Sequence, residues 1–194
     1  MSYYYLIASL PSLQMEQAPI SEEAFFARCE SELSARDYQT LQLLDSIPLP
    51  ENAASNAFVN SWNNLETQLR NAIAKIRASK RQTDASRVLR SHGGFATIIE
   101  DSVENAWAQS NPLDRERSLD ALRWQLLDDL AGPDPFSFRV ILSYAAKRKI
   151  AQRWGQMDAD TGWKQAQKSL EQQPAGEGRQ DDSETADENV GSQT

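Results

Sequence analysis

The clearest pattern in the chain is a run of hydrophobic residues at helical spacing between residues 55 and 81. Its members follow one another at steps of three or four: Phe58, Trp62, Leu65, Leu69, Ile73 and Ile76. Steps of this size place side chains on one face of an α-helix, while the intervening Asn, Gln, Lys and Arg residues fall on the other faces. The pattern predicts one amphipathic helix over residues 55–81, about 40 Å long, either at the surface or as one arm of a helical hairpin.

Two shorter helices are predicted before this one, each opened by a serine that can cap a helix N-terminus. Ser21 precedes two glutamates, which the positive end of a helix favours, and Ser34 precedes Asp37 by three residues. The first helix is expected to bury Phe25, Phe26, Cys29 and Leu33. The second is expected to bury Tyr38, Leu41, Leu44 and Ile47. Pro48 and Pro50 predict its end.

Three more helices are predicted in the second half of the chain. The first is marked by Phe95, Ile98, Ile99, Val103, Ala106 and Trp107. The second begins at Asn111 and Pro112, ends at Gly132 and Pro133, and carries the stripe Leu119, Leu122, Leu126 and Leu130. The third begins at Asp134 and Pro135 and is lined by Phe138, Ile141, Leu142, Ala145 and Trp154.

The fold class that follows is all-α, built from helical hairpins or a bundle. No region shows sustained alternation of hydrophobic and polar residues between turn signals, which is the pattern of a half-buried strand. The opening segment, residues 2–10, stays ambiguous, because so short an apolar run fits a buried strand or a short helix equally well.

The composition changes sharply at residue 174. Residues 174–194 hold six acidic residues and one arginine, and Val190 is their only large hydrophobic residue. Such a segment cannot bury enough surface to offset the entropy of ordering, so we predict a helical domain over 1–173 and a disordered acidic tail over 174–194. The tail is either a solubilising extension or an arm that binds a partner.

The charge balance and the hydropathy exclude several classes of protein. The 194 residues include 28 acidic and 20 basic ones, for a net charge of −8, which disfavours a non-specific nucleic-acid binder. No apolar run reaches the ~18 residues that a membrane span needs, and the hydrophobic stretch 3–8 has no basic flank of the kind that opens a secretory signal. A single cysteine, Cys29, cannot form an intrachain disulfide and fits a reducing cytoplasm.

Candidate catalytic and metal-ligating residues are sparse. The one histidine is His92 and the one cysteine is Cys29, too few for an ordinary zinc site, although a Cys–His dyad brought together by the fold stays open. Gly93 and Gly94 are not followed by the Lys and Ser or Thr of a phosphate-binding loop. Residues 158–162 begin like a calcium loop, but Ser169 occupies the place of its essential glutamate. We therefore expect that the protein is not an enzyme and binds no metal and no cofactor. A small enzyme that draws its acid–base chemistry from Asp, Glu, Tyr or Lys stays open, ranked third behind the two functions given below.

Two basic clusters are the candidate partner-binding residues. The first has a single acidic neighbour, Asp84, and contains Arg70, Lys75, Arg77, Lys80, Arg81, Arg87 and Arg90. The second has none and contains Arg139, Lys147, Arg148, Lys149 and Arg153. Basic residues late in a helix complement its dipole, which is the structural explanation. A docking surface for an acidic protein is the functional one, and nucleic acid is disfavoured because no known motif accompanies the charge.

Two stretches carry a resemblance to known families. The opening Met1-Ser2-Tyr3-Tyr4-Tyr5-Leu6-Ile7-Ala8-Ser9-Leu10-Pro11, with residues 20–23 and Cys29 after it, resembles a bacterial family without assigned function whose members are typically encoded beside components of V/A-type ATPases. The stretch from Asp134 to Tyr144, continuing to Lys147, Ile150 and Arg153, resembles the Pro-Phe-Ser start and Tyr-containing helix of the C-type (d-type in eukaryotes) component of these ATPases. We refer to that component as the socket component, because it receives the foot of the central stalk.

The resemblance implies an all-helical protein with the architecture of part of the socket component, which sits on the membrane rotor ring. It implies a non-catalytic subunit or accessory factor, cytoplasmic and peripheral to the inner membrane, that links stalk to ring or assists assembly. Its expected partners are the central-stalk and rotor-ring subunits, without nucleic acid. The alternative is a helical adaptor or chaperone-like protein that binds an acidic protein partner.

Overall fold

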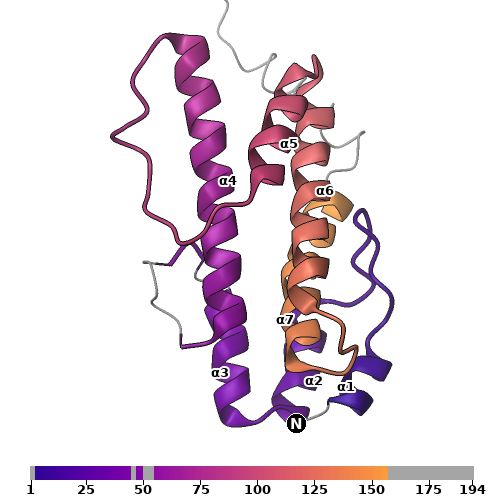
Figure 1. Ribbon diagram of the computed structural model, residues 1–194. Coiled ribbons are helices and arrows are strands. Elements are labelled where there is room, and N and C mark those ends of the chain that lie inside the picture. The colour runs from indigo at the N-terminus through magenta and orange to yellow at the C-terminus, as the bar shows by residue number, and fades with distance from the viewer. Residues whose placement is uncertain (1–2, 45–46, 50–54, 157–194) are drawn as a thin grey trace, which may run out of the picture. The chain divides into compact units, whose positions relative to one another are not determined.

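The computed structural model of the protein describes residues 3–44, 47–49 and 55–156. Within these ranges the chain is helical and contains no β-strand, which confirms the all-α fold class. The helices are α1 (Tyr4–Ser9), α2 (Glu22–Glu32), α3 (Ala35–Leu43), α4 (Ala57–Arg81), α5 (Thr97–Ala108), α6 (Pro112–Ala131) and α7 (Phe138–Gln156) (Figure 1). These residues belong to one compact unit that ends at Gln156.

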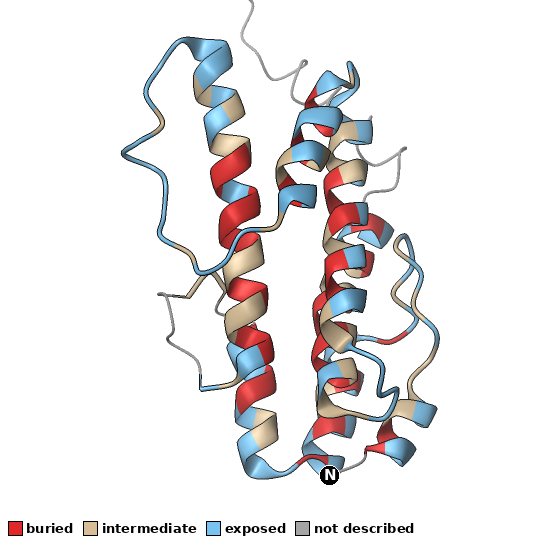
Figure 2. Cartoon of the chain, viewed as in Figure 1, coloured by how far each residue is buried: buried red, intermediate tan, exposed pale blue. Residues whose placement is uncertain are grey.

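The long helix predicted over residues 55–81 is confirmed as α4, which has 25 residues. Asn56 caps its start by accepting hydrogen bonds from the backbone N–H groups of Phe58 and Val59. Gln82 ends it in the left-handed conformation, at φ 53°. Figure 2 shows buried positions along much of the helix, and they include Phe58, Trp62 and Leu69.

Helices α5, α6 and α7 form two consecutive hairpins, and α4 packs against α5 and α6. Asn111 caps α6 through the backbone N–H of Leu113, with Pro112 at the first helical position, and Gly132 ends the helix at φ 75°. The leucines predicted to form the stripe of α6 include Leu119, Leu122 and Leu126, all of which are buried. The helical hairpins expected from the sequence are therefore present.

The N-terminal part consists of three short helices. Residues 4–9 form α1, which settles the choice between strand and helix in favour of helix. Ser21 caps α2 and Ser34 caps α3, each by accepting from a backbone N–H three residues on, as predicted. Helix α2 packs on α1 and α3, and α3 packs on α7, so this part closes against the C-terminal hairpin.

Three buried amide side chains of α4 hold the connecting segments in place. Asn63 bonds both the N–H and the C=O of Leu49, at 2.8 and 3.1 Å. Asn71 does the same to Arg90, at 3.0 and 2.7 Å, and Gln68 to Ala96, at 2.9 Å each. Because each side-chain amide accepts from a backbone N–H and donates to the C=O of the same residue, it fixes the connecting segment to which that residue belongs. The faces of α4 that carry these amides are therefore partly buried, whereas the hydrophobic pattern of the sequence placed polar residues away from the buried face.

Two sequence predictions in this region are wrong in detail. Phe95 precedes α5 and is 67% exposed, and Ile98 is 41% exposed, so neither joins the core stripe that continues through Ile99 and Val103. Helix α7 begins at Phe138 and not at Asp134, because the Asp134 carboxylate accepts from the N–H of Phe136 and closes a separate turn.

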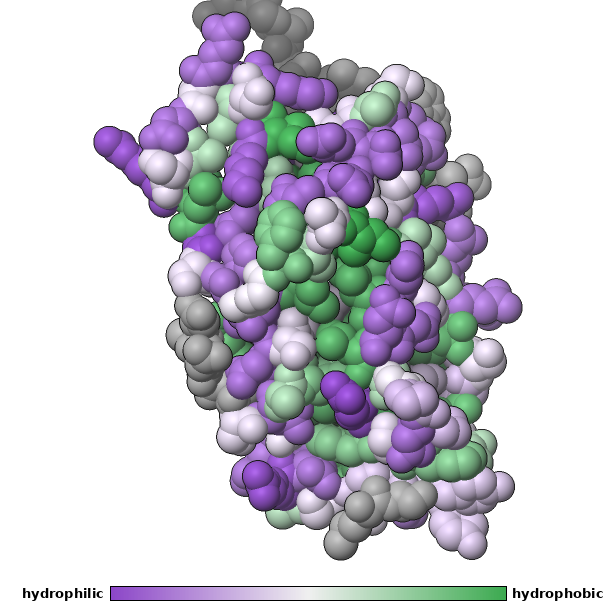
Figure 3. Space-filling model, in the orientation of Figure 1, coloured by the Kyte–Doolittle hydropathy of each residue, from purple (hydrophilic) through white to green (hydrophobic). Residues whose placement is uncertain are grey.

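On the face shown in Figure 3, hydrophobic atoms gather along the middle, over the seam between α4 and α6.

Several predictions fall on residues outside the described ranges. These are the acidic tail over 174–194, the end of the helical domain at residue 173, the calcium-loop comparison over 158–162 with Ser169, and Pro50. No described helix is both long enough and apolar enough to cross a membrane.

Candidate protein-interaction site

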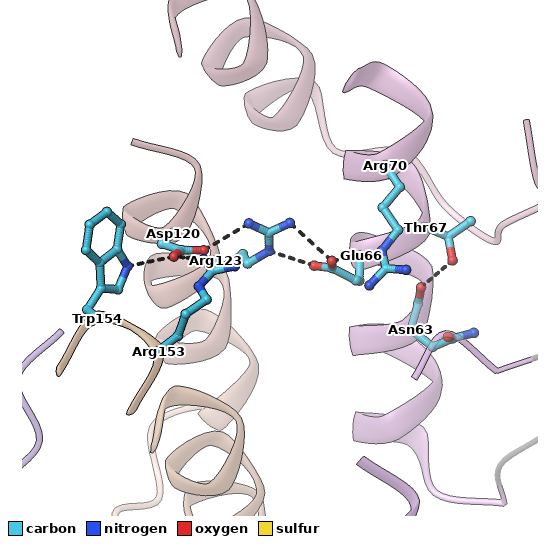
Figure 4. A network of polar contacts seen from close by, with 8 residues as sticks. All are labelled: Asn63, Glu66, Thr67, Arg70, Asp120, Arg123, Arg153 and Trp154. Atoms are coloured by element: carbon cyan, nitrogen blue, oxygen red, sulfur yellow. Dashed lines mark hydrogen bonds and ion pairs between the residues drawn. The ribbon is translucent and has the colours of Figure 1, made fainter. Parts of the chain in front are cut away.

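A buried ion-pair network joins α4 to α6. The Arg123 guanidinium, on α6, donates to both oxygens of the Glu66 carboxylate on α4, from Nε at 2.9 Å and from Nη2 at 3.2 Å. Figure 4 shows this side chain reaching across the space between the two helices. The paired, parallel geometry is the strong form of an Arg–carboxylate interaction, and only 7% of the Glu66 side chain is exposed.

The same guanidinium meets a second carboxylate, Asp120, which is fully buried. Asp120 accepts from Arg123 Nη1 at 2.9 Å, from the indole N–H of Trp154 at 2.7 Å, and from Arg153 Nη2. Trp154 and Arg153 come from α7, so the network ties α4, α6 and α7 together (Figure 4). A buried carboxylate is tolerated because these donors replace the water it has lost.

Beside this network lies a groove of about 570 Å³ between α4, residues 83–88 and α6. We call it the α4–α6 groove. Its lining includes Arg70, Ile73, Arg77, Arg81, Val88 and Leu119. A second cavity of about 340 Å³ shares Glu66, Arg70 and Arg123 with it and adds Lys149 and Arg153. The two cavities are therefore adjacent, and the Arg70, Arg123 and Glu66 side chains lie between them.

The first basic cluster is divided by the fold between this groove and other surfaces. Arg70, Arg77 and Arg81 line the groove. Lys75 lies 3.8 Å from the Glu100 carboxylate on α5 and so turns to the other side of α4. Lys80 and Arg87 are exposed, and the backbone of Arg90, also exposed, is held by Asn71. Three of the seven residues are thus brought together as one surface.

The second basic cluster does not form one surface either. Lys147 pairs with Asp128 and lies 5.0 Å from the Trp124 ring, and Arg153 pairs with Asp120. Lys149 lines the second cavity and donates to the Leu44 carbonyl at 3.4 Å, while Arg139 is exposed near the start of α7. The absence of acids in the sequence nearby is offset by acids that reach α7 from other helices.

Arg148 requires a correction, since a residue 1% exposed cannot contact a partner. Its guanidinium lies 5.5 Å from the Phe25 ring, donates to Gln152 at 3.0 Å and pairs with Glu22 at 3.2 Å. These contacts connect α7 to α2. A partner-binding role for Arg148 was wrong because its helix face is turned inward, which the linear spacing of charges does not reveal.

Cys29 and His92 are the two residues that a Cys–His dyad would need, and each has well-defined surroundings. Burial raises the pKa of the Cys29 thiol to about 12, so at neutral pH it is a protonated, unreactive side chain. His92 Nδ1 lies 3.1 Å from the carbonyl of Gly94 in its own loop. Within residues 3–44, 47–49 and 55–156 there is no group of three or more His, Cys, Asp or Glu side chains that could hold a metal ion.

Sequence reasoning missed the residues at the centre of the network: Glu66, Asp120, Arg123 and Trp154 in its polar role. One signal was present. Glu66 lies four residues after Trp62 and three before Leu69, which places a carboxylate on the hydrophobic stripe itself. A charged residue at such a position predicts a buried ion pair. Its partner, 57 residues away on another helix, could not be identified from spacing.

Comparison with known proteins adds one family. Residues 101–173 match the model of a family described as a protein of unknown function (DUF2764). The matched region includes α6 and α7, and with them Asp120, Arg123 and Trp154. No curated protein and no solved structure matches the chain.

Proposed function

We propose that the protein is a non-catalytic subunit or accessory factor of a V/A-type ATPase. In this proposal it binds the central-stalk and rotor-ring subunits, either to link them or to assist their assembly, and it lies peripheral to the inner membrane on the cytoplasmic side. The observation that carries the proposal is the resemblance of residues 1–11 and 134–153 to families associated with these enzymes.

Packing between these two stretches supports the proposal. The N–H of Tyr3 donates to the carbonyl of Phe136 at 3.0 Å, and the Tyr144 hydroxyl donates to the carbonyl of Pro11 at 2.9 Å. The rings of Tyr3 and Phe138 lie 5.9 Å apart. Residues far apart in the sequence therefore form one continuous region, as expected if both belong to one binding surface.

This region also exposes aromatic side chains. Tyr4 is 52% and Tyr5 82% exposed, and the Tyr4 ring lies 4.9 Å from that of Phe136. Exposed, clustered aromatic rings are typical of the residues that contribute most to protein–protein binding. We assign to Tyr4, Tyr5 and Phe136, called here the aromatic cluster, a role in contacting another subunit.

The test is co-purification from gently solubilised native membranes, with tagged protein and identification of partners by mass spectrometry. The proposal predicts stalk and rotor-ring subunits at near-equal stoichiometry, and their loss when Tyr4 and Tyr5 are both changed to serine. The control is Phe95→Ser, which removes a ring elsewhere whose exposure, 67%, lies between those of Tyr4 and Tyr5. Recovery of other proteins in place of ATPase subunits contradicts the proposal and favours the helical adaptor.

A non-catalytic role has its own test. The isolated protein is expected to show no ATP hydrolysis above the background of a mock purification. Hydrolysis that disappears when groove residues such as Arg70 or Arg123 are substituted would contradict the proposal, because it would place an active site in this chain.

A further inference from the structure

From the charge and shape of the α4–α6 groove, we infer that it binds an acidic segment of a partner protein in which hydrophobic residues alternate with Asp or Glu. The inference deepens the proposed function, on which it rests, by specifying the chemistry through which a partner subunit docks. It concerns a surface separate from the aromatic cluster.

The groove has a built wall. Residues 82–96 connect α4 to α5 over a long path without helix, and Asn71 and Gln68 hold this path at Arg90 and Ala96. The Asp84 carboxylate accepts from both the N–H and the hydroxyl of Ser86, hydrogen bonds that lower the pKa of that carboxyl. Long connections within compact domains are commonly functional, and this one keeps Val88 at the edge of the groove, 63% exposed.

On the α4 side of the groove, arginine side chains alternate with small or hydrophobic ones. Arg70, Arg77 and Arg81 are separated by seven and four residues, which keeps them on one face of the helix. Ile73, Ala74 and Ala78 lie between them on the same face, with Leu119 opposite on α6. The small alanine side chains leave the hollow in which a partner's hydrophobic side chain fits.

Basic side chains outnumber acidic ones in the groove lining, where Arg70, Arg77, Arg81 and Arg123 face Glu66, Asp84 and Glu116. Arg70 has 52% of its side chain exposed, and Arg77 and Arg81 are also exposed. Of the acids, Glu66 is buried and pairs with both Arg123 and Arg70, while the exposed Asp84 keeps its negative charge, because the hydrogen bonds from Ser86 lower the pKa of its carboxyl. Glu116 is half-buried. Glu66 thus offsets the charge of Arg123 and Arg70, which leaves Arg77, whose guanidinium lies 5.5 Å from the Trp107 ring, and Arg81 as the rim arginines offered to an acidic ligand.

The dimensions fit a short peptide segment. From Glu66 to Arg81 the groove follows about 22 Å of α4, the length of about seven residues of extended chain. A nucleic acid fits less well, since the chain as a whole carries −8 and the hydrophobic floor offers phosphates nothing.

The experiment measures fluorescence anisotropy of the full chain with a labelled peptide of about ten residues that alternates Glu with Leu or Val. Its comparison probes are an all-Glu peptide of the same length and a single-stranded oligonucleotide of equal charge. We expect the alternating peptide to bind more tightly than either comparison probe, and its affinity to fall as the ionic strength rises to about 0.3 M. Failure of the alternating peptide to bind, or tighter binding of the oligonucleotide, overturns the inference.

Two variants locate the binding. Arg77→Glu with Arg81→Glu reverses the rim, and Ala78→Trp fills the floor without changing the charge. Each variant is expected to lower the affinity for the alternating peptide about tenfold or more. The control for charge is Lys80→Glu with Arg36→Glu, two exposed residues outside the groove lining, which is expected to leave binding unchanged. Equal losses in the control and the groove variants, or no loss in either groove variant, contradict the inference.

Failure of this inference is distinguishable from failure of the proposed function. If ATPase subunits co-purify with Arg77→Glu/Arg81→Glu as well as with the unaltered chain, the groove is not their docking site and the function stands. If they do not co-purify with the unaltered chain, the function fails whatever the peptide does.

Discussion

At the scale of single residues, Asp120 holds the most consequential position described. It is fully buried, and its carboxylate accepts from Arg123, Arg153 and Trp154, so its charge is balanced by side chains from its own helix and from α7. Removing the Asp120 charge breaks its ion pair with Arg123, whose side chain is 15% exposed, and leaves Glu66 as the other carboxylate of that arginine; breaking a buried pair costs more than the pair contributes when complete.

Asp120→Asn is therefore expected to lower the free energy of unfolding by about 3 kcal/mol, measured by urea denaturation. Asp128→Asn is the control, because Asp128 pairs with Lys147 at the surface, where 63% of its side chain is exposed, and such pairs contribute about 0–1 kcal/mol. Equal effects of the two substitutions would show that the network is not a structural element.

Cys29 gives a second residue-scale prediction. Its thiol is buried on α2 and its pKa is raised to about 12, so the folded protein at pH 8.5 is expected to react with iodoacetamide far more slowly than the protein in urea. The folded state favours the neutral thiol, so this group's contribution to stability is lost as pH rises from the pKa of the unfolded thiol, about 8.5, toward the raised pKa of the folded one. Rapid labelling of the native protein would contradict the burial.

At the scale of elements, α4 organises the described part of the fold. Its hydrophobic stripe packs toward the core, and its buried amides fix the segments around Leu49, Arg90 and Ala96. The connection that forms one wall of the α4–α6 groove thus depends on hydrogen bonds from the helix at Arg90 and Ala96, together with the local bonds between Asp84 and Ser86.

Asn71→Ala is expected to raise the hydrogen-exchange rate of the Arg90 amide and of its neighbours in the 82–96 connection, because the N–H and C=O of Arg90 lose their partner. Amides in the middle of α6 are expected to exchange as before. Asn105→Ala, at an exposed position of α5, is the control. Unchanged exchange at Arg90 would show that the amide does not hold the connection.

The elements could be predicted well because their signals are local. Ser21, Ser34 and Asn111 cap helices within three residues, and the stripe of α4 repeats within one turn. The candidate site could be predicted only in part. Arg70, Arg77 and Arg81 follow from helical spacing, whereas the Glu66–Arg123 pair, the inward turn of Arg148 and the internal roles of Asn71 and Gln68 depend on which helices become neighbours.

At the scale of the whole molecule, the charge is unevenly distributed along the chain. The segment 174–194 carries a net charge of −5 and one large hydrophobic residue, while the basic rim of the α4–α6 groove lies within the helical part. An acidic protein with a basic groove is suited to an acidic partner that the rest of its surface does not attract.

Deleting residues 174–194 is expected to leave the melting temperature almost unchanged, because this segment has almost no hydrophobic surface to bury. Differential scanning calorimetry of the two chains at equal concentration makes the comparison. A fall of several degrees would contradict the boundary at residue 174 drawn from composition.

The most direct test of the account is photo-crosslinking in the native cell. A photoreactive amino acid replaces Arg81 in the groove or, as the control, Arg36 on α3, and the crosslinked partner and peptide are identified by mass spectrometry. We expect a crosslink from position 81, absent from position 36, to an acidic and partly hydrophobic segment of a V/A-type ATPase stalk or rotor-ring subunit. A specific crosslink from position 81 to a protein outside that ATPase, or to nucleic acid, would contradict it.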